Sequence, residues 1–296
     1  MKNILTIVIF LTVGYVYGQG NYNIKNLEVN TEYSDFGVSY YGGDAIYASS
    51  KKDNNKSRKN WTNGQPYLEL YRGAIDGTGE IIDSDAFSDN LSTKYHESNA
   101  IFTKDLKTVY FTRNNYFESH YGKDSIGWNN LKMYKADVAD GGEWSNIMPM
   151  PFNDDNYSVG HPALSNDERT LYFTSDMPGS MGETDIFKVS VNSDGSYGAP
   201  MNMGSQINTF GKEMFPYVSK KGNLYFSSDS RGGLGGLDVY VVPLNNATVE
   251  PLNLGTPINS NLDDFSFIID NDKNTGYFSS NRSGGMAMMI SITLPS

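Results

Sequence analysis

The stretch Glu213–Leu244, EMFPYVSKKGNLYFSSDSRGGLGGLDVYVVPL, decides the fold of this chain. Its β-branched and aromatic residues are broken by Gly and Ser clusters, a composition typical of short strands joined by turns. It predicts three strands, over Phe215–Ser219, Leu224–Ser228 and Asp238–Val242. A Lys-Lys-Gly turn follows the first strand, and a glycine-rich loop precedes the third.

The same pattern recurs along the chain. LYFTSDMPGSMGETDIFKV (171–189) repeats it closely and GYFSSNRSGGMAMMISI (276–292) more loosely, while VYFTRNN (109–115) and AIYASSK (45–51) open degenerate copies. Self-similarity of this kind indicates a repeat architecture. The aromatic residue at the centre of the second strand marks five units, at spacings of 63, 62, 53 and 52 residues: Tyr47, Tyr110, Tyr172, Tyr225 and Tyr277.

The units differ mainly in one loop. The step from the marker tyrosine to the matching residue of the third strand is 24 residues in the first two units and 15 in the other three. The loop between the second and third strands is therefore about nine residues longer in units one and two. In unit five this count makes Ile292 the match of Tyr240, and it places Ile290 at the position of Asp238.

The two ends of the chain complement each other. NIKNLEVN (23–30) ends in Asn before a polar turn, as the segments that join the units do, so we interpret it as a fourth strand without its first three. The fifth unit ends after its third strand. A ring in which the first strand completes the last blade leaves no open seam, and propellers limit exposed sheet edges in this way. We predict an all-β fold, a single five-bladed β-propeller of four-stranded antiparallel blades over residues 19–296, with blade units of about 31–87, 88–153, 154–208, 209–259, and 260–296 plus 23–30.

The first eighteen residues have the pattern of a secretory signal peptide. Lys2 precedes the apolar run Ile4–Val13, and the small residues Val16 and Gly18 stand before Gln19. The run is too short to span a membrane, and no other apolar run approaches 18 residues, so we expect no transmembrane segment in the mature chain.

Zero cysteines exclude disulfides and a lipid anchor on an N-terminal thiol. The formal charge of −11, without a basic stripe, argues against a nucleic-acid partner.

Motifs of units three and four resemble a known repeat. They include Asn253-Leu-Gly255, Leu224-Tyr-Phe-Ser-Ser-Asp229 and Gly-Gly-Leu-Asp-Val-Tyr240. This pattern is similar to the TolB-type propeller repeat, in particular to the version in envelope proteins of the OmpA family from gliding, type IX-secreting bacteria. The resemblance covers nearly all of 23–296 and implies an envelope protein, in the periplasm or else at the cell surface or secreted. The other units depart from it, because the third-strand Asp (Asp185, Asp238) is replaced in them by Glu69, Lys132 and Ile290.

Candidate site residues gather at the start of the innermost strands. A carboxylate stands five residues after the joining Asn in several units, and unit three has Val159 there with His161 two residues later. Gathered carboxylates repel unless something positive joins them, so this ring can bind a cation, an amine or an N-terminus. The structural alternative is that each acid accepts hydrogen bonds from backbone amides of the neighbouring blade. The acids are Asp35, Glu97, Glu213 and Asp264.

The two long loops are the second candidate. Residues 49–68 hold a basic island followed by Trp61 and Tyr67, and residues 112–131 hold Tyr116, Phe117 and Trp128. Aromatics with cations are the composition of interaction surfaces and also suit stacking on sugar rings. In an antiparallel blade these loops lie at the end where the innermost strands begin, so we expect the acids and the loops on one face. The alternative is that the aromatics only cover the blade tops.

The sequence favours a binding module over an enzyme. It has no nucleophile motif, and repeat-equivalent acids do not suit the distinct roles of a glycosidase pair. Asn153-Asp-Asp-Asn156 suggests calcium but lacks the full ligand spacing, so a solvated turn is the interpretation, and we expect no cofactor. The main prediction is an exported, non-catalytic propeller that binds an envelope or secretion-system protein. The alternatives are a glycan-binding or glycoside-hydrolysing propeller with Glu97, Glu213 and Asp264 around the pocket, and a metal-stabilised structural ring.

Overall fold

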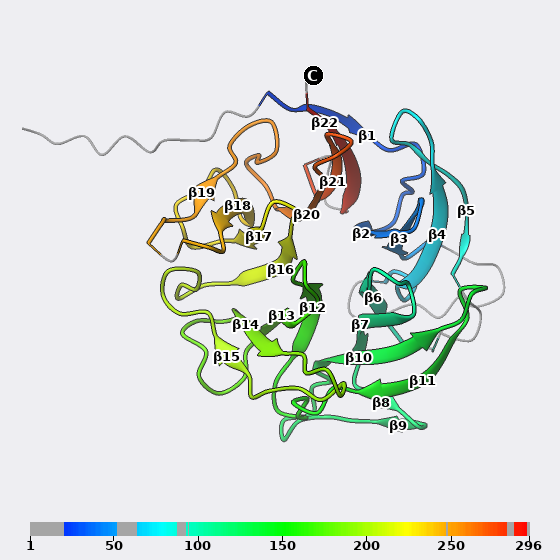
Figure 1. The fold of residues 1–296 in the computed structure, drawn as a ribbon, viewed down its shortest axis with the longest axis vertical. Coiled ribbons are helices and arrows are strands. Elements are labelled where there is room, and N and C mark those ends of the chain that lie inside the picture. The colour runs from blue at the N-terminus through cyan, green and yellow to red at the C-terminus, as the bar shows by residue number, and fades with distance from the viewer. Residues whose placement is uncertain are drawn as a thin grey trace, which may run out of the picture.

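A computed structural model describes residues 21–51, 64–87, 93, 95–246, 248–282 and 287–294. Five four-stranded antiparallel sheets stand around a central axis like the blades of a disc (Figure 1). The part of the chain that is described contains strands and turns and no helix. The predicted all-β, five-bladed propeller is therefore confirmed. The signal peptide predicted at 1–18 lies outside the described residues.

Each blade runs from an innermost strand at the axis to an outermost strand at the rim. Blade one contains β2 (Asp35–Tyr41), β3 (Asp44–Ser49), β4 (Glu69–Ile75) and β5 (Ile81–Ala86). Blade two contains β6 (Glu97–Phe102), β7 (Thr108–Asn114), β10 (Leu131–Val138) and β11 (Trp144–Pro149), and a small hairpin of β8 (Tyr116–Phe117) and β9 (His120–Tyr121) stands in its long loop. Blade three contains β12 (Val159–Leu164), β13 (Thr170–Ser175), β14 (Asp185–Ser190) and β15 (Met201–Asn202). Blade four contains β16 (Glu213–Val218), β17 (Asn223–Ser228), β18 (Asp238–Pro243) and β19 (Leu252–Asn253). Blade five contains β20 (Asp264–Asp270), β21 (Thr275–Ser280), β22 (Met288–Thr293) and β1 (Asn23–Asn26).

The ring closes as predicted, because β1 is the outermost strand of blade five. It pairs antiparallel with β22, with Asn23 opposite Thr293 and Asn26 opposite Ile290. The side chain of Asn30 adds a clamp: its Nδ2 donates to the carbonyl of Met289 at 2.8 Å, and its Oδ1 accepts the Met289 amide at 2.9 Å. The last blade therefore has no unpaired seam at β22.

The register corrects one detail of blade five. Phe278 lies opposite Ile290, as Phe226 lies opposite Tyr240, so Met288 rather than Ile290 holds the position of Asp238. The predicted match is two residues out because the loop between β21 and β22 is two residues shorter than the corresponding loop of blade four. Counting from the marker tyrosine does not detect a shortening inside a loop.

The hydrophobic core is divided among the five joints between blades. Successive side chains of a strand point to opposite faces of its sheet, so the Tyr-Phe pair in the second strand contacts both neighbouring blades. Tyr172 packs in the core shared with blade four, and Phe173 packs in the core shared with blade two. Tyr225 and Phe226 divide in the same way between the joints on the two sides of blade four. Each fully buried phenylalanine stabilises the ring by about 1.5–3 kcal/mol.

Among the described residues there is no helical segment long and apolar enough to cross a membrane.

Candidate functional site

The four predicted acids lie where the innermost strands begin, but they point into the blades. Their side chains are 0–2% exposed. Each accepts a hydrogen bond from the backbone amide four residues earlier, as Asp35 Oδ2 does from Thr31 at 2.6 Å and Glu213 Oε2 from Thr209 at 2.7 Å. The structural alternative named amides of the neighbouring blade, and that detail is wrong: these donors belong to the turn that leads into the acid's own strand. The same holds for the other two acids, whose donors are Thr93 and Ser260.

Each acid also lies close to a cation near the end of the second strand of its blade: Arg113 lies within β7, and the other three cations follow the strand. Arg113 Nε lies 3.2 Å from Glu97 Oε1, and Arg282 Nη2 lies 2.6 Å from Asp264 Oδ1. Burial raises the pKa of Asp35 and the pKa of Glu213, and the charges of Lys51 and Arg231 oppose these shifts.

Blade three shows that the acid and the cation belong together. It has Val159 in place of the acid and Met177 in place of the cation, and both side chains are buried in one hydrophobic cluster. Leaving one member of a buried ion pair costs more than replacing both by apolar groups. The repeat acids are therefore structural groups that close the turn at the start of four of the blades, and their side chains are buried away from the channel.

Glu97 differs from the other acids in one respect. Its Oε1 accepts from Thr93 and faces Arg113, but its Oε2 is buried without a hydrogen-bond partner. Burial raises the pKa of Glu97 to about 7, Arg113 opposes this shift, and the charge of Glu69 on the adjacent blade adds to it. The backbone brings the two glutamates together, because the Glu97 amide donates to the Leu68 carbonyl at 3.0 Å.

A second ring of residues, two positions after the acids, does face the axis. In every innermost strand the pairing register shifts after the first two residues, as it does between Phe36 and Ser39. Such a bulge turns the extra residue away from the ladder and re-aims its side chain. All five residues at this position have φ in the left-handed region, from 46° to 74°: Gly37, Asn99, His161, Phe215 and Ser266. We call these five the inner ring.

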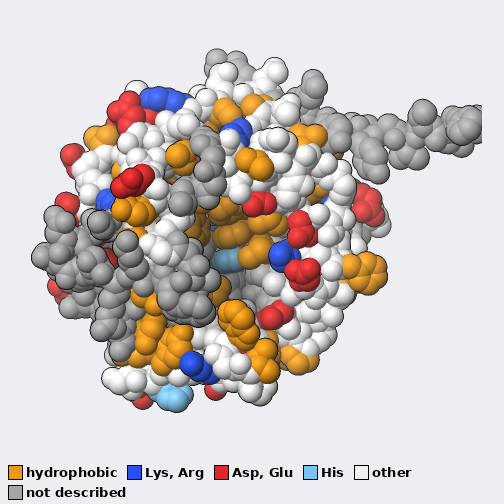
Figure 2. Space-filling model, turned by 180° about the vertical axis from the view of Figure 1, so that it is seen from behind, with side chains coloured by type: hydrophobic (Ala, Val, Ile, Leu, Met, Phe, Trp, Pro, Cys, Tyr) orange, Lys and Arg blue, Asp and Glu red, His pale blue; other side chains and the backbone are white. Residues whose placement is uncertain are grey.

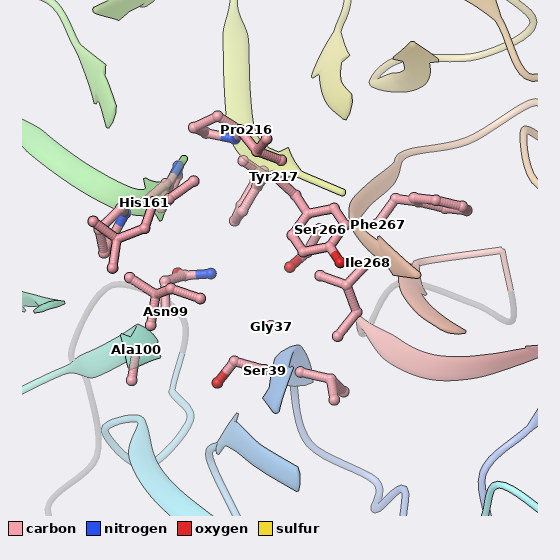
Figure 3. Close-up of a pocket in the computed structure, with 17 residues that line it drawn as sticks. Gly37, Ser39, Asn99, Ala100, His161, Pro216, Tyr217, Ser266, Phe267 and Ile268 are labelled. Carbon is pink, nitrogen blue, oxygen red and sulfur yellow. The ribbon is translucent and has the colours of Figure 1, made fainter. Parts of the chain in front are cut away.

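The inner ring lines a cavity of about 80 Å³ on the propeller axis (Figure 3). Asn99 points its amide toward the middle of the ring, opposite Ser266. Three polar atoms are buried there without a hydrogen-bond partner: Asn99 Oδ1, His161 Nδ1 and Ser39 Oγ. Gly37 leaves room for the Asn99 amide, because a Cβ at Gly37 would lie 2.9 Å from Asn99 Nδ2. Unpaired buried polar atoms at a cavity are costly unless water or a ligand pairs with them.

Aromatic rings continue the site toward the channel mouth. The His161 and Phe215 rings stack at 3.9 Å with 13° between their planes. Phe215 contacts Phe265 at 4.8 Å, and Phe265 contacts Phe36 at 5.9 Å. Burial lowers the pKa of His161 to about 3, so its imidazole is neutral at physiological pH. Figure 2 shows a hollow at the centre of the disc that holds hydrophobic side chains and a histidine, with acidic side chains on one side of its rim.

The structure divides the predicted loop residues. Tyr67 and Tyr116 join one cluster through Tyr95, at 5.9 Å and 4.8 Å between ring centres, and His96 contacts Tyr67 at 4.7 Å. Phe117 packs on Tyr134 at 6.1 Å. Trp128 stands apart with 62% of its surface exposed. Trp61 lies outside the described residues.

The segment suggested for calcium forms a local turn. Asp154 Oδ1 accepts the amide of Asn156 at 3.0 Å and its Nδ2 at 2.8 Å. Within the described part of the chain, no group of three or more His, Asp or Glu side chains is placed to hold a metal ion.

Sequence reasoning found only one member of the inner ring, His161. It missed Gly37, Asn99, Phe215 and Ser266. The sequence holds no clear signal for them, because the residues on either side of this position vary from unit to unit as much as the position itself. The bulge that turns this position toward the axis breaks the simple alternation of a strand, so the direction of these side chains does not follow from their spacing.

Neither a protein-family model nor a curated protein matches the chain. Solved structures share its fold. A β-xylosidase/α-arabinofuranosidase of glycoside hydrolase family 43 from a compost microbial metagenome is 11% identical, with a TM-score of 0.53 over 92% of this chain and 94% of that chain. An α-L-arabinofuranosidase from Lactobacillus brevis is 11% identical, with a TM-score of 0.53 over 86% and 88% of the two chains. A protein of unknown function from Dyadobacter fermentans is 12% identical, with a TM-score of 0.52 over 92% and 98%. At such identities the likeness shows the propeller fold.

These neighbours correct two predictions. The sequence favours a non-catalytic protein-binding scaffold and no enzymatic activity, whereas four of the neighbours with a TM-score above 0.5 are described as glycosidases, two of them of family 43. They are not TolB-type or OmpA-type envelope proteins. The prediction against a glycosidase treated the repeat acids as the candidate catalytic pair. These acids are structural, so their equivalence does not argue against an enzyme. The alternative prediction, a glycan-binding or glycoside-hydrolysing propeller, is the better supported one.

Proposed function

We propose that this protein is a carbohydrate-active propeller that binds a glycan at the mouth of its central channel and hydrolyses a glycosidic bond there. The observation that carries the proposal is the inner ring, in which five equivalent positions present four different side chains and one glycine to one cavity. Left-handed backbone at non-glycine residues costs about 1–3 kcal/mol per residue and clusters at functional sites. Phe215 and His161 hold this conformation although their side chains are bulky.

The chemistry of the site suits a sugar. A pyranose or furanose has hydroxyl groups around its edge and an apolar face, so it needs hydrogen-bonding groups beside an aromatic surface. The cavity has the first in Asn99 and Ser266, and the aromatic surface of Phe36 and Phe265 begins one residue nearer the mouth. At about 80 Å³ the cavity is far smaller than the roughly 300–1,000 Å³ of ligand pockets. A sugar ring therefore lies over the mouth, with only a small group or water inside.

Hydrolysis needs two carboxylates that reach the glycosidic bond. The repeat acids are buried, so the proposal assigns this role to exposed carboxylates at the mouth. Asp176 accepts the Ser158 amide at 2.6 Å, and Asp229 accepts the Lys212 amide at 2.8 Å. Both follow the second strand of a blade and border the start of an innermost strand. The glycosidase neighbours named above support xylose- or arabinose-containing glycosides as the first substrates to test.

The test combines a glycan array with a panel of chromogenic xylosides and arabinofuranosides. The variants are His161→Asn and Phe215→Asn for binding, and Asp176→Asn and Asp229→Asn for turnover. Asn tolerates left-handed backbone, so the ring variants keep the bulge. We expect His161→Asn and Phe215→Asn to lose glycan binding. We expect Asp176→Asn and Asp229→Asn to bind the glycan but to hydrolyse it at least a hundredfold more slowly, which is the lower range for loss of a general acid or base. A blank array and a blank panel for the wild type would overturn the proposal.

Export belongs to the same proposal. The N-terminal segment has a signal-peptide pattern, and a periplasmic or cell-surface protein meets polymeric glycans. The TolB-type resemblance of the repeat, an envelope-protein partner and a metal-stabilised ring stay predictions. Cell fractionation tests the location: recovery of the full-length chain in the cytoplasm would contradict export.

A further inference from the structure

One phenylalanine stands almost entirely in solvent on a turn that leads into an innermost strand. Phe210 is 87% exposed, in the turn between Asn208 and β16. Met181 is 38% exposed in the loop before β14, and the backbone of its neighbour Gly182 contacts the Phe210 backbone. An exposed aromatic side chain that packs on nothing gains no stability from burial. The backbone turn that carries it is nevertheless held by several hydrogen bonds.

The turn that carries Phe210 is held from both sides. The buried carboxylate of Glu213 accepts the amide of Thr209 and its hydroxyl, both at 2.7 Å, and the Thr209 hydroxyl accepts the Gly211 amide at 3.2 Å. From the adjacent loop, Glu183 donates its amide to the Gly211 carbonyl at 2.9 Å. A Cβ on Gly182 would lie 2.5 Å from that carbonyl, so only glycine permits this approach. Phe210 is therefore presented on a rigid base.

The next joint repeats the arrangement with smaller side chains. Leu234 and Leu262 occupy the corresponding loops before β18 and β20, and they are 38% and 40% exposed. Charged side chains stand on the same two loops as Phe210 and Met181. Lys212 pairs with Glu183 at 3.2 Å, and both side chains remain largely exposed. Charged and apolar side chains therefore share these loops, and Figure 2 shows hydrophobic and acidic side chains beside the hollow.

We propose that Phe210, with Met181 beside it, is an outer sugar-stacking subsite, so that the ligand of the channel mouth is a polymeric glycan that extends from the mouth over blades three and four. The inference rests on the proposed function and adds the class of substrate. An aromatic side chain on a fixed backbone turn has only two χ angles to order, so it loses little conformational entropy when a flat ligand stacks on it. The centre of a protein interface is depleted of charged residues, whereas this surface mixes them with apolar groups, which favours a hydroxylated chain over a protein.

The test compares a short and a long ligand, xylobiose and xylohexaose, by calorimetric binding to the wild type, Phe210→Ala and Met201→Ala. Met201 is the matched control, since it is 60% exposed on the outermost strand β15. We expect Phe210→Ala to weaken xylohexaose about tenfold, which corresponds to 1.4 kcal/mol. We expect xylobiose binding to stay unchanged in both variants, and the control to bind both ligands like the wild type.

The outcomes separate the two proposals. If the wild type binds both ligands and Phe210→Ala binds them equally well, the outer subsite is overturned and the glycan site stands. An equal loss for both lengths overturns the outer subsite too, because Phe210 would then act on the mouth itself. If the wild type binds neither ligand and the glycan array is blank, the proposed function fails and this inference fails with it.

Discussion

Two rings of residues lie two positions apart along the same strands, and they differ in almost every property. The acid positions repeat one chemistry, are buried, and pair with a turn amide and a cation of their own blade. The inner ring repeats one backbone conformation, but its five residues all differ and line the cavity on the axis. In a repeat protein, a residue that recurs with the unit is explained by what each unit needs in order to fold. A position where only the backbone recurs is free to hold a site.

The test with the largest expected effect replaces the acid and the cation of blade five by the apolar pair of blade three. Asp264→Ala leaves the turn amide of Ser260 and the guanidinium of Arg282 without their partner, and we expect it to lower the free energy of unfolding by about 3–5 kcal/mol. The double variant Asp264→Val with Arg282→Met copies the pair Val159 and Met177. It should recover a large part of the loss in urea unfolding. A double variant as unstable as the single one would show that the two positions are not coupled.

Glu97 supplies a pH test of the buried ring. Its pKa is about 7 in the folded chain and about 4.5 unfolded, so the folded state holds the proton more tightly. The contribution of protonated Glu97 to the free energy of unfolding is fully present below pH 4.5. It is lost as the pH rises through 7, and the loss amounts to about 3 kcal/mol. Glu97→Gln should remove this part of the slope when unfolding is followed between pH 4.5 and 8. An unchanged slope in the variant would mean that Glu97 is ionised throughout.

A smaller effect tests the left-handed backbone of the inner ring, which the acid positions do not share. His161→Asn keeps a residue that tolerates φ near 51°, so we expect less than about 1 kcal/mol of destabilisation. His161→Val places a β-branched side chain in the left-handed region and should cost about 1–3 kcal/mol. Thermal unfolding of the two variants measures the difference. Equal stability would indicate that the bulge relaxes at this position.

The smallest effect concerns the long loop of blade two. Trp128 is largely exposed, so Trp128→Ala should change the free energy of unfolding by no more than about 0.5 kcal/mol. Tyr95 contacts both Tyr116 and Tyr121, and Tyr95→Ala is the comparison that should cost more. A tryptophan variant less stable than the tyrosine variant would contradict this prediction.

The repeats were enough to predict the fold, because the Tyr-Phe pairs reflect a strand that is buried on both faces, such as Tyr172 and Phe173. They also predicted the closure by β1. The site was harder, since spacing places Asp35 and Gly37 on the same strand but does not tell which of them faces the axis. That depends on the bulge and on the hydrogen bond between Thr31 and Asp35, and both arise only when the turn is folded.

The strand that closes the ring has a mechanical consequence. Asn23 lies opposite Thr293, so tension applied between the N-terminal side of β1 and the C-terminal side of β22 acts on the first pair of the ladder. Such a load peels the antiparallel pair apart one residue at a time, whereas a shearing load would strain all four pairs together. The side chains of β1 are mostly exposed, so few buried contacts would resist the peeling. Under tension the propeller should therefore open first between β1 and β22, the strand pair that completes blade five.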